Sequence, residues 1–238
     1  MQINIEINID INIDKDLPIC RRLNNDELFS IAIRLDFPDL VNFLSVNIQT
    51  MKLCKTNRIW DYKLQTEFSE YINSFQEYTQ KDKHTQKEKY KLLYKLNILK
   101  NKLKLNYNLD ILYNGREIHL ANREIETIPE ELGVLHNLQC LYLNNNNIQI
   151  IPEELFQYKH FLNLRILSLN RNKIENIPEK VCRLYNLQRL NLNHNQIREI
   201  PEELCQLVNL KYLDLRHNQI DNIPAIRRRN LPDAEILL

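Results

Sequence analysis

The chain has 238 residues, 43% of them hydrophobic, and its 32 basic and 31 acidic side chains give a net charge of +1. This balance gives no reason to expect a protein that binds nucleic acid or an anionic membrane surface. Only two glycines occur, which excludes a glycine-rich phosphate-binding loop. The length predicts one large domain or two small ones.

The five cysteines form no C-x-x-C pair, and their odd number indicates reduced thiols in an intracellular protein. Cys182 and Cys205 could be neighbours in space, but two buried thiols explain them more simply than a disulfide. The N-terminus lacks the pattern of a signal peptide, and no apolar run approaches the roughly 20 residues of a membrane span. We therefore expect a soluble, monomeric, cytoplasmic protein with no membrane partner.

The first 16 residues are of low complexity, because isoleucine alternates with Asn, Asp and Glu from Ile3 to Ile13. Strict alternation is the pattern of a β-strand, which would here add to a sheet edge. A tract this repetitive is equally typical of a disordered segment. Of the two, we favour a disordered tail over residues 1–16.

Residues 17–69 are expected to form a small helical domain. A helix capped by Asp26 should run from Leu28 to Leu35, where apolar residues recur every three or four positions. Pro38 ends that helix, since the residue before a proline is disfavoured in helical geometry. More apolar residues follow, including the only tryptophan, which its composition places in a core.

Residues 70–112 are expected to be a helical linker and cap. Their first part is too polar for a core. Leu92, Leu96, Leu99 and Leu103 then recur by four, three and four residues, which predicts one apolar helix stripe. Such a helix would cover the open hydrophobic end of the repeats that follow.

From residue 113 to residue 226 the chain repeats itself. Five copies of the apolar pattern L-x-x-L-x-L, the first with glycine and isoleucine variants, start near residues 115, 138, 164, 187 and 210. An asparagine follows each copy except the first, where Arg123 takes its place, at Asn146, Asn172, Asn195 and Asn218. An Ile-Pro pair comes next, with prolines at positions 129, 152, 178, 201 and 224. The second copy holds three extra residues within Phe156–Asn163.

This pattern predicts a stack of coils. The two leucines of L-x-L point to the same side of a strand, and one coil alone cannot bury them. The repeated asparagine can hydrogen-bond to the backbone of neighbouring coils. The Ile-Pro pair starts the return along the convex side, where a short helical turn and a small insertion are tolerated.

The repeats resemble the leucine-rich-repeat family, in its 23-residue intracellular class, over roughly half of the chain. The resemblance implies an α/β fold: a solenoid with a parallel sheet on its concave face and irregular or short helical segments on its convex face. It also implies that the solenoid binds another protein.

The side chains between the leucines are expected to face solvent on the concave sheet. The predicted partner-binding positions are Glu117, His119, Cys140, Tyr142, Ile166, Ser168, Arg189, Asn191, Tyr212, Asp214 and Arg216. This mixture is more typical of a protein-binding surface than of a phosphate site or an apolar ligand cavity. Five strands about 4.8 Å apart span only about 24 Å, so a large partner would also have to contact loops or the N-terminal domain.

No motif predicts a catalytic residue, a cofactor or a metal site. His194 and His217 occupy equivalent positions of adjacent copies, but a metal would need a third ligand and Asp214 belongs to another column. We therefore expect two solvent-facing polar residues. The run Arg227–Arg229 opens a C-terminal tail, residues 227–238, which we expect to be solvated, with partner contact or a localisation signal as alternatives.

Residues 23–68 resemble an F-box, the helical module that attaches a substrate receptor to a cullin–RING ubiquitin ligase through the adaptor subunit of the ligase. The resemblance rests on Glu27–Leu28, Ile31, Leu35, Asp36–Leu40, Ser45–Val46 and Ile59–Trp60. It implies that adaptor-facing or core helices are formed by Leu28, Ile31, Leu35, Pro38, Leu40, Val46 and Trp60. The alternative is that these side chains only pack a small helical domain.

The order of the two domains and the abundance of Asn, Ile and Lys make the whole chain similar to the F-box/leucine-rich-repeat proteins of large AT-rich DNA viruses of amoebae. This resemblance implies a non-enzymatic substrate-recognition subunit of a ubiquitin ligase, acting in the cytoplasm of the host cell. The alternative is a leucine-rich-repeat scaffold with no link to ubiquitin. Neither function requires a cofactor.

Overall fold

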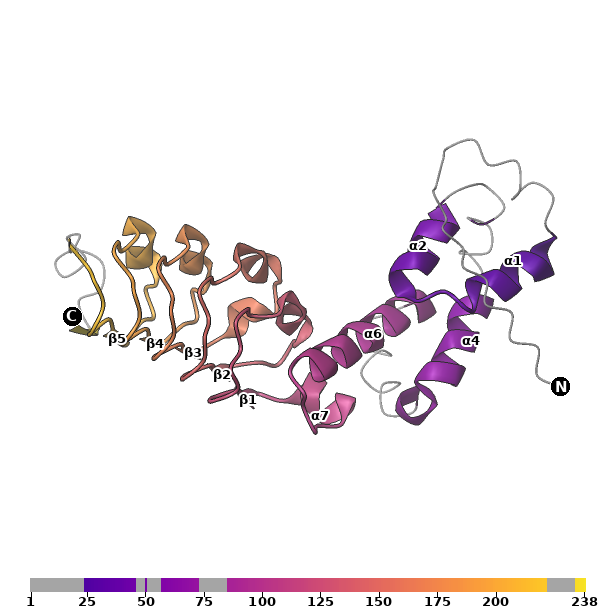
Figure 1. The fold of residues 1–238 in the computed structure, drawn as a ribbon, viewed down its shortest axis with the longest axis horizontal. Helices are drawn as coiled ribbons and strands as arrows, with labels where there is room; N and C mark the ends of the chain where they lie inside the picture. Colours follow the sequence, from indigo (N-terminus) through magenta and orange to yellow (C-terminus); the bar gives the residue numbers. More distant parts are fainter. Residues whose placement is uncertain (1–23, 46–49, 51–56, 73–84, 222–233) are drawn as a thin grey trace. The chain divides into compact units, whose positions relative to one another are not determined.

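The computed structural model describes residues 24–45, 50, 57–72, 85–221 and 234–238 (Figure 1). The chain divides into two compact units, residues 1–72 with 83–90, and residues 73–82 with 91–238. The predicted N-terminal tail and the run Arg227–Arg229 lie outside the described residues, as does Val46. None of the described helices is long and apolar enough to span a membrane.

The first unit contains three described α-helices, α1 (Asn25–Ala32), α2 (Phe37–Ser45) and α4 (Arg58–Glu67), and the 3₁₀ helix η2 (Ser69–Tyr71). The predicted cap of α1 was wrong by two residues. The side chain of Asn24 accepts hydrogen bonds from the backbone N–H groups of Asp26 and Glu27, and Glu27 accepts one from the backbone N–H of Asn24. This reciprocal capping box stabilises the first turn better than Asp26 alone could. At its other end α1 stops at Ala32, and Leu35 lies after the helix.

An aromatic cluster forms the core of the first unit. The ring of Tyr90 lies 5.9 Å from that of Trp60, 5.8 Å from that of Phe37 and 5.6 Å from that of Phe68. Trp60 is 1% exposed, which agrees with its expected place in a core. The phenol of Tyr90 donates a hydrogen bond of 2.5 Å to Glu67, whose carboxylate also pairs at 2.6 Å with the buried ammonium group of Lys63. The carboxylate thus satisfies a buried positive charge that would otherwise be costly.

Helix α6 (Gln86–Lys102) carries the apolar stripe predicted before the repeats, with one correction. Its buried leucines are Leu93, Leu96 and Leu99, followed by Leu103, whereas Leu92 is half-buried. Spacings of three and four residues both keep side chains on one helix face, so the leucine pattern fitted either position. The shorter helix α7 (Leu109–Asn114) follows and buries Leu109 and Leu112.

The second unit confirms the predicted solenoid. Its parallel sheet runs in chain order through β1 (Glu117–His119), β2 (Cys140–Tyr142), β3 (Ile166–Ser168), β4 (Arg189–Asn191), β5 (Tyr212–Asp214) and β6 (Glu235–Leu237). The strands pair without offset, so that Leu141 lies opposite Leu167, and Leu190 opposite Leu213. The central leucines are buried between the coils. In Figure 1 the strands follow one another along one side of the stack, and the helical turns lie on the other side.

The convex side is built from 3₁₀ helices that begin directly after a proline. They are η3 (Glu130–Val134), η4 (Glu153–Gln157), η6 (Glu179–Arg183) and η7 (Glu202–Gln206). The fixed φ of proline suits the entry to a helical turn, as the Ile-Pro pairs predicted. The second copy contains the additional 3₁₀ helix η5 (Phe161–Asn163), which buries Phe161 and Leu162. Phe161 and Asn163 occupy the positions of Leu184 and Asn186 in the next copy, so the three extra residues precede η5, where Lys159 and His160 are exposed.

The repeated asparagines join each coil to the one before it. The side-chain amide of Asn172 donates to the carbonyls of Leu143 and Leu169, at 2.9 Å each, and its oxygen accepts from the N–H of Ile148 at 3.0 Å. Asn146, Asn195 and Asn218 make the same set of bonds. These side chains thus provide hydrogen-bond partners for backbone N–H and C=O groups where the chain leaves the sheet.

Arg123 replaces asparagine in the first coil for a visible reason. Its guanidinium donates a 2.9 Å hydrogen bond to the carbonyl of Leu103, at the end of α6. Lys102, at the last position of α6, pairs at 2.7 Å with the buried carboxylate of Glu131. The first coil has no earlier coil to bond to, and these two side chains attach it to the helix instead.

The expectation that residues 227–238 are only a tail was wrong for the described residues 234–238, because β6 extends the sheet. Ile236 lies opposite Leu213, and the N–H of Leu215 donates to the carbonyl of Leu237 at 2.8 Å. Ile236 and Leu238 follow Leu213 and Leu215 by one repeat length. The copy was missed because Asp233 stands where its first leucine should be.

Candidate functional site

The side chains that point outward from the strands form two columns across the sheet, on what we call the concave face. One column contains Glu117, Cys140, Ile166, Arg189, Tyr212 and Glu235, and the other contains His119, Tyr142, Ser168, Asn191, Asp214 and Leu237. Of the predicted partner-binding residues, those exposed are Glu117, His119, Arg189 and Arg216, and those half-buried are Tyr142, Ile166, Ser168, Asn191 and Tyr212. Cys140 and Asp214 are buried.

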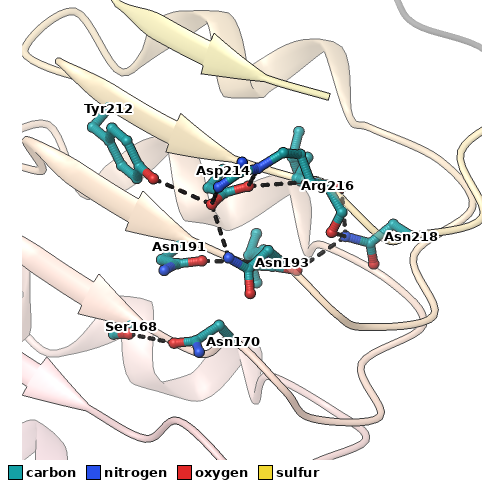
Figure 2. Close-up of polar contacts among 10 residues, drawn as sticks. Ser168, Asn170, Asn191, Asn193, Tyr212, Asp214, Arg216 and Asn218 are labelled. Atoms are coloured by element: carbon teal, nitrogen blue, oxygen red, sulfur yellow. Dashed lines mark hydrogen bonds and ion pairs between the residues drawn. The ribbon is translucent and has the colours of Figure 1, made fainter.

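Asp214 is not a free surface carboxylate, as its place in the column had suggested. It is 1% exposed and lies at the centre of a hydrogen-bond network (Figure 2). Arg216 donates to it through Nε at 3.0 Å and through Nη2 at 2.8 Å. The amide of Asn193 donates at 2.8 Å, and the phenol of Tyr212 donates at 3.2 Å. Asn193 was not among the predicted partner-binding residues, although the sequence places it one repeat length before Arg216, in the same concave column.

The network decides the charge of Asp214. Burial alone would raise the pKa of this carboxyl. The hydrogen bonds from Arg216, Asn193 and Tyr212 lower it by more than burial raises it, to well below its usual range. Asp214 is therefore ionised at neutral pH, and it keeps the guanidinium of Arg216 and the phenol of Tyr212 in fixed orientations. These two side chains reach the surface with little rotamer freedom left to lose.

A second contact fixes Tyr212 from β4, because the guanidinium of Arg189 lies 4.9 Å from the centre of its ring. Tyr212 and Arg189, together with Tyr142, Ile166, Ser168 and Asn191, line a shallow depression of about 230 Å³. Its lining combines aliphatic and aromatic side chains with polar ones. The depression has the size and chemistry to receive one or two side chains of a partner.

The β1 end of the concave face is also organised by ring contacts. The imidazole of His119 stacks on the ring of Tyr142, with centres 4.5 Å apart, and lies 3.6 Å from the carboxylate of Glu117. Burial and the nearby Glu117 raise the pKa of the Cys140 thiol, so this thiol is un-ionised and a poor nucleophile at neutral pH. Cys182 and Cys205 are also free thiols with pKa values raised by burial.

His194 and His217 meet, as their positions in adjacent copies suggested. Their rings stack with centres 4.1 Å apart and planes inclined by 15°. Both residues have left-handed backbone, with φ of 53° and 58°. No group of three metal-ligating side chains occurs among the described residues, and parallel stacked rings do not direct their lone pairs to one point.

The F-box-like residues of the first unit divide into core and surface. Leu28, Leu40 and Trp60 are buried, so they support the fold rather than a docking face. Ile31 and Leu35 are half-buried, and Pro38 is exposed in the first turn of α2. A further surface group was missed by the sequence analysis: the ring of Phe29 meets that of Tyr62 at 5.9 Å, and the guanidinium of Arg58 lies 4.4 Å from the Phe29 ring centre.

Family comparisons agree with the repeat structure. One model described as a leucine-rich repeat matches residues 163–220, and another matches residues 137–158. These segments cover the second to fifth copies. No curated protein matches the chain.

Solved structures resemble part of the chain, and two of the following three are described as containing leucine-rich repeats. A leucine-rich-repeat protein of Leptospira interrogans has 37% identity over 52% of this chain and 31% of its own, with a TM-score of 0.47. Internalin C2 of Listeria monocytogenes has 29% identity over 51% of each chain, with a TM-score of 0.44. The ectodomain of the Arabidopsis thaliana receptor kinase GASSHO1/SCHENGEN3, solved with Casparian strip integrity factor 2, has 31% identity over 44% of this chain and 13% of its own, with a TM-score of 0.40. In each case this chain spans about half of the other protein or less.

Proposed function

We propose that this leucine-rich-repeat protein holds a polypeptide target on its concave face and brings it to a cullin–RING ubiquitin ligase, whose adaptor subunit docks on the helical unit. The solenoid is the interaction module of the pair. Catalysis belongs to the ligase, so the chain itself needs no nucleophile or general base. We place this activity in the cytoplasm of the host cell.

The observation that carries target binding is that buried Asp214 fixes Tyr212 and Arg216, while Arg189 packs against the Tyr212 ring. Tyrosine and arginine dominate the energetics of most protein interfaces. Side chains held in place before a partner arrives lose less conformational freedom when they bind. A network that served only stability would not need to present an aromatic ring and a guanidinium beside an open depression.

The six strands set the size of what can be held. At about 4.8 Å per strand, the sheet offers a strip about 29 Å wide, which fits an extended segment of roughly eight or nine residues. A standard interface of about 800 Å² per partner would require the neighbouring loops as well. A target is therefore recognised first through a short exposed segment.

Target binding is tested by proximity labelling in the native host cell with variants of the concave face. Tyr212→Ala and Arg189→Ala should remove the same group of labelled proteins, because both variants disrupt one ring contact. Tyr185→Ala is the matched control, since this tyrosine is 51% exposed outside the sheet. If all three variants label the same proteins as the wild type, the concave face is not the target site.

Adaptor docking is supported by the resemblance to the F-box and by the division of its residues. With Leu28, Leu40 and Trp60 in the core, the helices leave Pro38 exposed beside half-buried Leu35. Pro38→Glu tests this face without loosening the fold, because an acidic residue is favourable in the first turn of a helix. Gln65→Glu, at an exposed position of α4, adds the same charge elsewhere on the unit.

The measurement is recovery of purified adaptor subunit by the immobilised protein. Wild type and Gln65→Glu should retain the adaptor, and Pro38→Glu should not. If the wild type retains no adaptor, the proposed role in a ubiquitin ligase is wrong. The alternative function then remains, a leucine-rich-repeat scaffold that binds its partner without a ligase. Trp60→Ala is unsuitable here, since loss of this core ring would unfold the unit.

A further inference from the structure

A row of positively charged and imidazole side chains follows the strands β3 to β5. We call it the basic row, and it consists of Arg171, Lys173, His194, Arg216 and His217, all exposed. The turns that carry it are held in register by the backbone. The N–H groups of Arg171 and His194 donate to the carbonyls of Asn193 and Arg216, each at 2.9 Å. The row therefore has strand-like spacing and a defined shape.

The charges of the basic row are poorly balanced by acidic groups. Asp214 is the carboxylate that faces it, and this carboxylate is buried and engaged by Arg216. Within the described part of the chain, Arg171 and Lys173 form no ion pair. The concave depression lies beside the basic row. Ser168 and Asn191 of its lining contact Asn170 and Asn193, which directly precede Arg171 and His194.

The stacked histidines sit among these cations. The groups that face His194 are His217, Arg171, Arg216 and Asp214. Partial desolvation, followed by the neighbouring His217 and Arg171, lowers the pKa of His194, and Asp214 opposes this only weakly. In the free protein this imidazole is therefore uncharged at neutral pH. A bound anion would reverse the balance by favouring the charged ring.

We infer that the polypeptide segment held by the concave face is acidic, that its carboxylates lie along the basic row, and that its binding tightens as the pH falls. This inference rests on the proposed target binding and gives the target its chemical class. Arg171 and Lys173 attract the segment at any pH, while His194, which stacks on His217, adds charge on acidification. The adjoining depression receives an apolar side chain of the same segment.

The direction of the pH effect follows from proton linkage. Binding of carboxylates raises the pKa of the His194 imidazole, so the complex takes up a proton that the free protein does not hold. Affinity therefore increases as the pH falls through the pKa of the bound His194, and it levels off below the pKa of the free one. Between pH 7.5 and pH 6 we expect about a fivefold gain, since each unit of linked pKa shift is worth at most tenfold.

The experiment is a selection from a library of displayed random 12-residue peptides on the full-length protein, followed by titration of a selected peptide carrying a fluorophore. Three variants are compared with the wild type. Arg171→Asn with Lys173→Gln removes the two fixed charges of the row that form no ion pair, and leaves Arg216 paired with Asp214. His194→Asn with His217→Asn removes the stacked imidazoles, and asparagine tolerates their left-handed backbone. Lys159→Gln with Arg183→Gln, at exposed convex positions, is the matched control.

The expected result is enrichment of Asp and Glu over Lys and Arg beside an apolar residue. The first variant should weaken binding at both pH values, the histidine variant should abolish only the gain at pH 6, and the control should match the wild type. Selected peptides that bind the concave face without acidic enrichment would overturn this inference and leave the proposed function standing. A library that yields no peptide sensitive to Tyr212→Ala would count against both. Equal displacement by a single-stranded oligonucleotide would show general polyanion binding and also overturn it.

Discussion

At the scale of single residues, Asp214 links stability to pH. Its pKa lies well below the usual value because of the hydrogen bonds that it accepts, so its stabilising effect is present above the unfolded pKa of about 4 and is lost as the pH falls below it. Asp214→Asn should lower the free energy of unfolding at pH 7 by roughly 2 kcal/mol. The difference from the wild type should shrink as the pH is lowered towards 3.

Urea unfolding followed by far-UV circular dichroism measures this difference. The fluorescence of Trp60 provides an internal control, because the only tryptophan lies in the first unit and should be unaffected. If the difference in unfolding free energy between the wild type and Asp214→Asn stays constant between pH 7 and pH 3, the charge of the carboxylate does not contribute to the stability of the network.

Left-handed backbone at residues other than glycine is a second residue-scale feature. Lys104 has φ of 48° at the position after the C-cap of α6. The N–H of Leu105 donates to the carbonyl of Lys100, and the N–H of Lys104 donates to that of Asn101, which is the Schellman arrangement. Lys104→Gly should therefore raise the free energy of unfolding by about 1 kcal/mol. Lys91→Gly, inside the same helix, should lower it by about as much, as measured by thermal and urea unfolding.

At the scale of elements, one close approach joins two convex turns. A Cβ atom on Gly133 of η3 would lie 2.2 Å from the Tyr158 ring, at the end of η4. Gly133→Ala should therefore destabilise the solenoid by roughly 1–3 kcal/mol. Tyr158→Ala removes the obstacle, so the double variant should be more stable than the sum of the single effects predicts. Strict additivity in urea unfolding would show that the ring moves aside freely.

The strands and convex turns were largely predictable, because one repeat length determines both the strand register and the position of each turn. The leucine spacing set the register of β1 to β5, and the Ile-Pro pairs marked the start of η3, η4, η6 and η7. The predictions that failed concern side chains whose burial depends on contacts with neighbouring residues, which no local sequence pattern reveals. Asp214 and Asn191 occupy equivalent positions, yet only the former is buried, because Arg216 and Asn193 close over it.

A second set of asparagines shows the same limit. Asn163, Asn186 and Asn209 precede the first leucine of their copies and donate to the carbonyls of His136, Leu162 and Tyr185 on the preceding coil. Their spacing of 23 residues is visible in the sequence, but no local pattern shows that their amides reach the preceding coil. Two sets of amides therefore join the coils, one at each end of the strands.

At the scale of the solenoid, the free energy of unfolding is a sum of the stabilities of the coils and of the contacts between neighbouring coils. A terminal coil has a neighbour on one side only, so its other side must be covered in another way. At the first coil Arg123 and Lys102 tie the stack to α6. At the other end β6 supplies the last backbone partners, with Leu215 donating to Leu237, and Glu235 to Lys211 at 3.0 Å. Without β6, one side of β5 and its leucines would lie open to water.

Removal of residues 234–238 should therefore destabilise the solenoid far more than its five residues suggest. Ile236→Asp should have a similar effect, because it places a charge opposite Leu213 at a half-buried site of the stack. We expect a loss of roughly 1–3 kcal/mol in the unfolding monitored by circular dichroism, with the Trp60 transition unchanged. Glu235→Gln, an exposed change in the same strand, is the control. If the truncated and full chains unfold at the same urea concentration, β6 does not cover the stack in solution, and the open side of β5 would itself be available to a partner strand.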